Sequence, residues 1–391
     1  MSEQKPIRSG PLAGIRVLEL PAIGPVPFAG SLMADMGADV IRLDRIQNVD
    51  LGTAVPASYD FYNRNKRSLA IDLKNPDGVT TVLRLLDKFD ILLEGFRPGV
   101  AERLGLGPEE CLKANAKLVY GRMTGWGQVG PNAHEVGHDI NYLALTGALH
   151  SIGIKDQPPS IPLNLVADLG GGAMYLAFGA IAALTEARQS GRGQVVDVGM
   201  IDGVSNLMSA FLAYRQLGTW SLERQSNIVD GGAPYYATYE TRDNKFIAVG
   251  AIESRFYASL VERLGLRIED LPPQNEQTSW PMMRKRFAEV FRTRSRSEWV
   301  EHMAGHDACF SPVLDLDEAQ EHPQMKARQV FTEFEGLVHP APTPRFSRTP
   351  GSIYMKPPQT GQHSREVLGQ LGFSKSEIDV LVNSGAIRQI D

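Results

Sequence analysis

The sequence has only two cysteines among 391 residues, Cys111 and Cys309, and they lie far apart. We therefore expect no disulfide framework, and cysteine use of this kind fits a protein of the reducing cytosol. Positive charge is not in excess, because 40 Lys and Arg face 45 Asp and Glu, which gives a net charge of -5. This balance argues against a general nucleic-acid-binding protein.

Long hydrophobic runs are also missing. The first residues contain no apolar segment of the kind found in a secretory signal peptide. The most apolar run, at about 170–184, is shorter than the roughly 20 residues that span a bilayer, and Glu186 and Arg188 close it. We expect a buried core helix there, no membrane partner and a cytoplasmic location.

Three familiar motifs are absent as well. The turn after the first predicted strand lacks G-x-G-x-x-G, and no Walker A sequence occurs, so NAD-dependent and P-loop chemistries lose their main support. His302 and His306 have the spacing of two zinc ligands, with Asp307 and Cys309 nearby, but H-E-x-x-H is absent. The sequence therefore predicts no metal site.

Strand and helix patterns alternate through the first 125 residues. Apolar runs at 15–20, 40–43 and 117–123 read as strands, and the apolar stretch 26–36 between two of them reads as a helix. This order predicts βαβ units and a mostly parallel sheet, hence an α/β fold. A chain of this length has room for two or three domains.

The later part of the chain changes character. Helices are predicted at 170–188 and 200–217, and the runs 235–241 and 245–251 flank a turn, which indicates a hairpin and the start of a smaller domain. A proline-rich connector is predicted over 337–358, followed by helix over 364–387.

Basic residues recur in the N-terminal half. Such residues are usually a solvated face, but several follow predicted strands, where an α/β sheet binds ligands and where arginine suits an anionic group. The cluster consists of Arg42, Arg45, Arg64, Lys66, Arg67, Arg97 and Arg103.

Three further residues carry candidate chemistry. His138 precedes a helical pattern in GHDINY, where a local structural contact is the ordinary interpretation. Asp168 precedes three glycines and a long helix; it is either an N-cap or a residue beside free N–H groups that hold an oxyanion. Glu253 follows a strand pattern and is either a helix-start carboxylate or a site residue.

Taken over nearly the whole chain, the sequence resembles the family III CoA-transferases and, within them, the α-methylacyl-CoA racemases. The resemblance to the racemases depends mainly on His138 and Glu253, because transferase members typically carry Tyr or Phe before the aspartate of this motif. The stretches that carry the resemblance include PLAGIRVLELPAIGPVPFA, GADVIRLDR, RNKRSLAIDL, LLEGFRPGVAERLGLG, YGRMTGWGQVGP, GHDINYLALTGAL, DLGGGAMYLAFGAIAAL, GGAPYYATYET and AVGAIE.

The resemblance implies an interlocked homodimer with a Rossmann-like large domain and a small α+β domain. The expected boundaries are 1–200 for the large CoA-binding domain, 201–230 for a linker helix region, 231–330 for the small domain and 331–391 for a segment that returns to the large domain. The active site would lie between the large domain of one chain and the small domain of its partner. CoA is then part of the substrate, and no separate cofactor is expected.

The implied reaction, in lipid metabolism, is 1,1-proton transfer at C2 of a 2-methylacyl-CoA through an enolate. His138 and Asp168 would be the two bases, and Glu253 would act across the dimer by orienting His138. The expected contacts to CoA and the acyl group are Arg97 and Arg103, with Arg42 and Arg45 behind them, and Ile23, Met123 and Tyr142.

Two alternatives remain open. In CoA transfer between carboxylic acids, Asp168 would be a nucleophile that forms an anhydride and then an aspartyl-CoA thioester. A non-catalytic acyl-CoA-binding protein would keep the arginines but would not require both His138 and Asp168.

Overall fold

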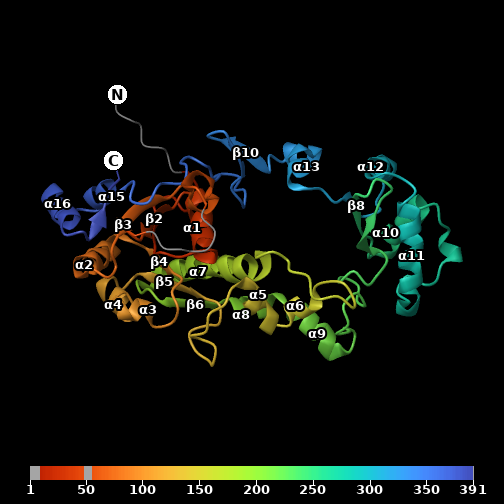
Figure 1. Ribbon diagram of the computed structural model, residues 1–391, viewed down its shortest axis with the longest axis horizontal. Coiled ribbons are helices and arrows are strands. Elements are labelled where there is room, and N and C mark those ends of the chain that lie inside the picture. Colours follow the sequence, from red (N-terminus) through yellow and green to blue (C-terminus); the bar gives the residue numbers. More distant parts are fainter. Residues whose placement is uncertain (1–8, 48–54, 391) are drawn as a thin grey trace. The chain divides into compact units, whose positions relative to one another are not determined.

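The computed structural model describes residues 9–47 and 55–390, which belong to two compact units (Figure 1). The large unit comprises Met1–Thr146, Leu163–Leu207 and Val330–Asp391, and the small unit comprises Gly147–Pro162 and Met208–Gln329. The sequence places 147–162 in the large domain, whereas these residues pack with the small unit. The chain passes from the large to the small unit again after Leu207. At this point the predicted helix 200–217 breaks at Met208 into α8 (Met200–Leu207) and α9 (Ser209–Leu217).

A seven-stranded sheet forms the centre of the large unit, in the order β12-β3-β2-β1-β4-β5-β6. Its first six strands in the sequence are parallel to their neighbours, as predicted, and β12 pairs antiparallel with β3. The strands are β1 (Arg16–Glu19), β2 (Asp39–Asp44), β3 (Arg67–Ile71), β4 (Ile91–Glu94), β5 (Val119–Thr124), β6 (Val195–Gly199) and β12 (Ile387–Arg388).

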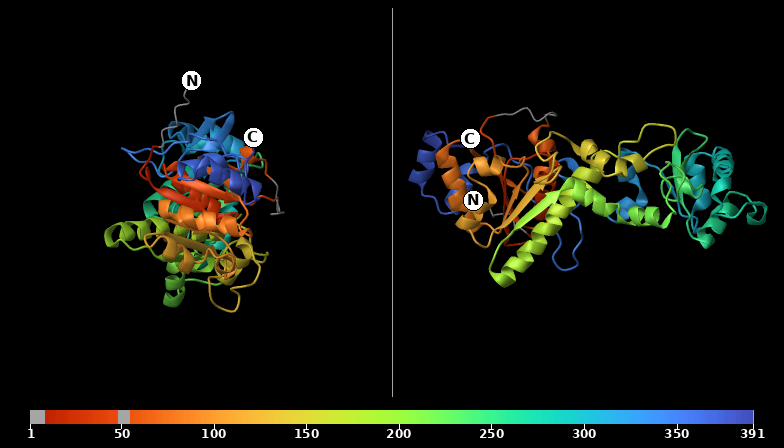
Figure 2. Two further views of the ribbon diagram at one scale, coloured as in Figure 1. Left: turned by 90° about the vertical axis from the view of Figure 1, so that its left-hand side faces the viewer. Right: turned by 90° about the horizontal axis from the view of Figure 1, so that it is seen from below.

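The sheet separates two hydrophobic cores because successive strand residues point to opposite faces. Val17 packs on one face with α1 (Pro25–Asp35) and α7 (Met174–Ser190). Leu18 packs on the other face with four further helices of this unit (Figure 2). These are α2 (Pro76–Leu85), α4 (Pro108–Ala114), α15 (Ser364–Gln370) and α16 (Lys375–Asn383).

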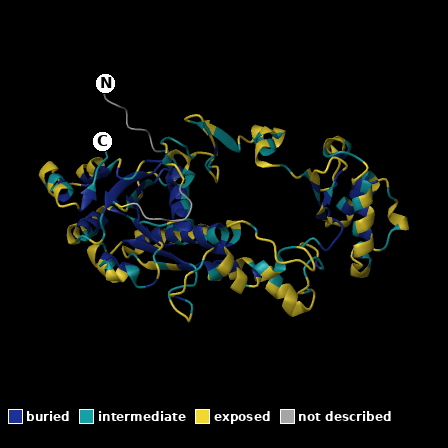
Figure 3. Cartoon of the chain, viewed as in Figure 1, coloured by how far each residue is buried: buried dark blue, intermediate teal, exposed yellow. Residues whose placement is uncertain are grey.

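A continuous helical stretch, Leu165–Ser190, is longer than the helix that the sequence predicts. It opens as a π-helix, η4 (Leu165–Ala173), and continues as α7. By length and composition it is the one helix among the described residues that could cross a membrane, a test that soluble core helices also pass. Of its most apolar window 33% is buried, so only part of this helix packs inside the unit (Figure 3). Met174 and Phe178 are exposed.

The C-terminal segment packs with the large unit. It forms a hairpin, β10 (Phe331–Phe334) and β11 (Leu337–Pro340), and ends with β12 on the edge of the large sheet. β11 lies inside the predicted connector. The sequence predicts helix up to Ile387, but α16 ends at Asn383 and Ile387 belongs to the strand β12. The predicted end of the helix is therefore wrong.

The small unit contains a three-stranded antiparallel sheet, β7-β8-β9. The predicted hairpin is present as β7 (Tyr236–Glu240) and β8 (Phe246–Gly250), and β9 (Phe310–Pro312) completes the sheet. The α-helices of this unit are α6 (Ala148–Ser151), α9, α10 (Ser254–Arg263), α11 (Trp280–Phe291), α12 (Arg296–Met303), α13 (Leu316–Glu321) and α14 (Pro323–Ala327).

Candidate active site

Asp168 lies within the π-helix η4, near its beginning but not at its N-cap, which is Asn164. The buried carboxylate of Asp139 fixes the backbone here: its Oδ1 accepts hydrogen bonds from the N–H groups of Ala167 at 3.0 Å and Asp168 at 2.7 Å. Asp139 therefore occupies the N–H groups of Ala167 and Asp168. That the N–H groups after Asp168 hold an oxyanion stays a prediction.

The Asp168 carboxylate is half-buried among a few polar neighbours. Asn164 Nδ2 donates to its Oδ2 at 3.2 Å, and an ideal Cβ on Gly24 would lie 3.4 Å from the same oxygen. Burial raises the pKa of Asp168, the charge of Asp139 raises it further, and the Asn164 hydrogen bond and the nearby His138 oppose this. The Asp168 carboxylate is therefore a stronger base than that of an exposed aspartate and still lies within the electrostatic field of His138.

His138 is exposed and immediately precedes α5 (Asp139–Leu145). Its backbone N–H donates to Asn141 Oδ1 at 3.0 Å, which fixes the residue at the start of the helix. The next residue, Asp139, is the one that holds the backbone of Asp168. The start of α5 thus links the two residues that the sequence singles out separately.

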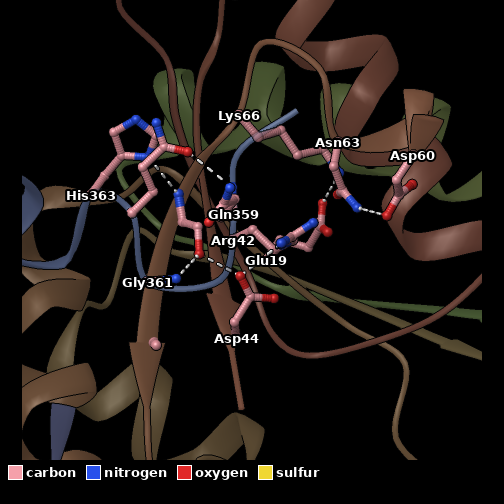
Figure 4. Close-up of polar contacts among 12 residues, drawn as sticks. Glu19, Arg42, Asp44, Asp60, Asn63, Lys66, Gln359, Gly361 and His363 are labelled. Carbon is pink, nitrogen blue, oxygen red and sulfur yellow. Dashed lines mark hydrogen bonds and ion pairs between the residues drawn. The ribbon is translucent and has the colours of Figure 1, made fainter. Parts of the chain in front are cut away.

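A turn after β1 brings Gly24 to Asp168. A buried ion pair between Lys66 and Glu19 supports this turn (Figure 4). Lys66 Nζ lies 2.7 Å from Glu19 Oε2, and both side chains are inaccessible to solvent. The same ammonium donates to the carbonyl oxygen of Pro27 at 2.8 Å, in the first turn of α1. The start of α1 is therefore anchored to the end of β1.

Tyr142, on α5, is a further residue within the influence of Asp168. Its hydroxyl donates to the carbonyl oxygen of Gly137, and its ring packs edge-to-face on Trp126 with 4.7 Å between centroids. Burial raises the pKa of the Tyr142 hydroxyl, the charge of Asp168 raises it further, and the charge of Arg97 lowers it. Tyr142 is therefore within the electrostatic influence of both groups.

The arginines predicted to bind an anion fall into two groups. Arg97, after β4, and Arg103, at the end of α3 (Val100–Arg103), are exposed. Arg42 forms an ion pair with Asp44 at 2.8 Å and is mostly buried (Figure 4). Arg45 is exposed just after β2. Arg97 and Arg103 are the better placed to meet a ligand.

The two predicted apolar contacts have different environments. Ile23 is 48% exposed and precedes Gly24, so it can meet a ligand held at Asp168. Met123 is 2% exposed and belongs to the core between the sheet, α1 and α7. Its placement on the surface of a substrate cleft is therefore corrected, because it lies beneath that surface.

Glu253 belongs to the small unit, where it is exposed and precedes α10. Its carbonyl oxygen accepts from the N–H of Tyr257, as in an ordinary helix start. Its action across a dimer stays a prediction. His302 and His306 are also in this unit; each has a ring nitrogen near Arg263, and the described residues contain no group of three metal-ligating side chains.

Three residues of the site were not singled out from the sequence. Asp139 stands inside the GHDINY motif, but its bonds to Ala167 and Asp168 join positions 28 and 29 residues apart. Asn164 stands in no motif that would mark it as a site residue. Tyr62 has a pKa that burial raises first and the charge of Asp168 raises further, which places it near that carboxylate. Only Asp139 had a recognisable signal, because it lies beside His138.

Comparisons with known proteins agree over most of the chain. The family model for CoA-transferase family III matches residues 12–364. The alpha-methylacyl-CoA racemase of Mus musculus is 46% identical over 369 residues, which cover 94% of this chain and 95% of that protein. The alpha-methylacyl-CoA racemase of Homo sapiens is 42% identical over 387 residues, covering 96% and 99%.

A CoA-transferase and a solved structure also match. Succinyl-CoA–D-citramalate CoA-transferase of Chloroflexus aurantiacus is 32% identical over 422 residues, which cover 97% of this chain and 98% of that protein. A CAIB/BAIF family protein from Brucella suis has the same fold, with a TM-score of 0.80 and 24% identity over 93% of this chain and 100% of that chain.

Proposed function

The chain belongs to CoA-transferase family III, and from that premise we propose that it is a racemase that interconverts (R)- and (S)-2-methylacyl-CoA thioesters. Its similarity to two racemases over almost the whole chain supports this function. The structural observation that supports it is that the charge of His138 acts on the pKa of Asp168, while Asp139, next to His138, holds the backbone N–H of Asp168. Inversion at one carbon needs two proton-transfer groups, and a histidine and a carboxylate can serve as these.

The reaction begins with removal of the C2 proton, which the thioester carbonyl makes acidic. One base takes the proton from one face of C2, and the conjugate acid of the other base returns a proton to the opposite face of the planar enolate. His138 and Asp168 are assigned these roles. The raised pKa of Asp168 suits it to return a proton in one direction and to accept one in the other.

The enolate oxygen needs hydrogen-bond donors, and Asp139 occupies the N–H groups of Ala167 and Asp168. We assign the N–H groups that follow Asp168 to the enolate oxygen. The N–H of Asp139 is a second candidate, because the first residues of a helix have N–H groups without intrahelical partners.

The CoA part of the substrate is assigned to Arg97 and Arg103, with Arg45 and the partly neutralised Arg42 in support. Tyr142 and Ile23 flank the thioester end. No separate cofactor is needed, because CoA is part of the substrate. We place the reaction in the cytoplasm and in the metabolism of branched lipid acids.

The finer assembly is also a proposal. In an interlocked homodimer, the partner's Glu253 would reach the large unit, orient the His138 ring and stabilise its charged form.

CoA transfer between acids is the second candidate, favoured by the family model and by the 32% identical CoA-transferase. Asp168 would then attack the thioester itself. One experiment separates the two: single epimers of 2-methylacyl-CoAs are incubated in D2O with the protein, with and without a free carboxylic acid. Deuterium at C2 with epimerisation supports the racemase, whereas new thioester that depends on the acid, without label, supports the transferase and contradicts our proposal.

A further inference from the structure

The two exposed arginines assigned to CoA come from neighbouring elements of the large unit. Arg97 lies in the turn after β4, and Arg103 ends the short helix α3. An ideal Cβ on Gly99 would lie 3.3 Å from Arg103 Nη1, so the guanidinium folds back over Gly99. Gly99 is only two residues from Arg97, and the two arginine-bearing segments therefore adjoin.

A third arginine, Arg122 on β5, contacts both of these segments. It is 8% exposed. Its Nε donates to Glu94 Oε1 at 3.1 Å and its Nη2 donates to Glu102 Oε1 at 3.0 Å. Glu94 is the last residue of β4, and Glu102 is next to Arg103 on α3. One planar guanidinium thus holds the end of a strand and a helix at a fixed separation.

Each carboxylate is tied to the backbone as well. Glu94 Oε2 accepts from the N–H of Phe96 at 2.7 Å, directly before Arg97. Backbone hydrogen bonds of Glu102 and Gly99 also reach the Glu102 carboxylate and, with Arg122, keep its pKa below its usual value despite partial burial. The positions of both arginine-bearing segments therefore depend on Arg122.

The turn is also packed against the candidate active site. An ideal Cβ on Gly95 would lie 2.9 Å from Val26 Cγ2 and 3.3 Å from Ala22 Cβ, so the backbone of the turn touches the segment that carries Gly24. Arg122 itself is committed to two carboxylates and is buried. It is therefore suited to hold other residues in place rather than to contact a ligand.

We propose that Arg122, Glu94 and Glu102 form a clamp that sets the spacing of Arg97 and Arg103 and so prepares them to bind the phosphates of CoA. The proposal rests on the CoA site of the proposed function but not on the chemistry at C2. Binding is tighter when flexible side chains are ordered before the ligand arrives, because the entropy cost has already been met in folding. Arg122 is then a positioning residue, and its loss weakens affinity for CoA rather than proton transfer.

The test compares Arg122→Gln with a matched control, Arg64→Gln. Arg64 is equally buried, at 8% exposure, and forms an ion pair with Asp35 at 2.6 Å, but it is not part of the clamp. Three quantities are measured for each full-length variant: the Kd of CoA by calorimetry, kcat and KM for a 2-methylacyl-CoA, and kcat/KM for the matching N-acetylcysteamine thioester. The last compound lacks every phosphate.

We expect Arg122→Gln to raise the Kd of CoA and the KM of the CoA thioester about tenfold, the loss expected when charge-assisted contacts are weakened. Its kcat, and kcat/KM for the truncated thioester, should stay near wild type, and Arg64→Gln should leave the Kd of CoA unchanged. In an Arg97→Gln, Arg103→Gln background, Arg122→Gln should have no further effect on the Kd.

An unchanged Kd in Arg122→Gln would overturn the clamp. Equal losses with both thioesters, or the same rise of Kd in Arg64→Gln, would overturn it too, because they indicate general damage. Wild-type protein that fails to epimerise any 2-methylacyl-CoA would refute the proposed function, and the CoA titrations would then decide the clamp by themselves. Wild-type protein that does not bind CoA would refute both.

Discussion

Replacing Glu94 by Gln is expected to make the stability of the fold less dependent on pH. Glu94 is inaccessible to solvent, and burial raises its pKa from 4.5 to about 7 although the N–H of Phe96 and the charge of Arg122 both oppose the rise. The folded protein therefore keeps this proton to a higher pH than the unfolded chain does. The contribution of Glu94 to stability is fully present below pH 4.5 and is lost as the pH rises to about 7.

The magnitude follows from the same values. At about 1.4 kcal/mol per pH unit, a proton held to about pH 7 instead of 4.5 is worth about 3 kcal/mol. Gln has the shape of the protonated side chain and cannot ionise. The difference in free energy of unfolding between Glu94→Gln and wild type should therefore shift by about 3 kcal/mol in favour of the variant between pH 4.5 and pH 8.

Urea unfolding of both proteins at several pH values measures this difference. Comparing the two proteins at each pH cancels the contributions of all other titrating groups. Glu377→Gln is a control that should leave the profile between pH 5 and pH 8 unchanged, because the hydrogen bond from Arg84 lowers the pKa of the exposed Glu377 to about 2, far below this range. A constant difference between Glu94→Gln and wild type across this range would refute the assignment of a raised pKa to Glu94. A difference that moves in favour of wild type would mean that the ion pair with Arg122 outweighs burial.

The remaining predictions concern the proposed reaction. Asp168→Asn should lower kcat at least about 100-fold while CoA still binds, because it removes a proton-transfer group and keeps the shape; calorimetry and epimerisation assays check both parts. His138→Gln should still exchange the C2 proton of the epimer that faces Asp168 but should not invert it, and equal loss from both epimers would count against the two-base assignment. Gly24→Ala should lower both kcat and the melting temperature, because φ is 66° at Gly24 and the new methyl would lie 3.4 Å from Asp168 Oδ2. Arg103→Gln should raise the KM of the CoA thioester about tenfold and leave the truncated thioester unaffected, so a change in kcat alone would contradict its role.

The parallel sheet could be predicted because its strands are short apolar runs separated by helical patterns. The break at Met208 could not, since the residues around it continue a helical sequence on both sides. β12 is only two residues long, and its pairing with β3 is a contact across more than 300 residues. Such a strand has no local signature.

The site was only partly predictable for a similar reason. His138 and Asp168 each have a local context that sequence analysis can judge, but Asp139 acts on a backbone segment 28 residues away. Met123 illustrates the opposite error: every residue of β5 is buried, so alternation along the strand cannot tell which side chains reach a ligand.

The central claim is that two different groups serve the two faces of C2. It is tested most directly by incubating one pure epimer with wild-type protein in D2O and measuring deuterium in both epimers at low conversion. The inverted epimer should carry one deuterium at C2 from its first appearance, while the remaining starting epimer carries almost none. Inverted product that retains the original proton, or a starting epimer that takes up deuterium as fast as the inverted one, would contradict the account.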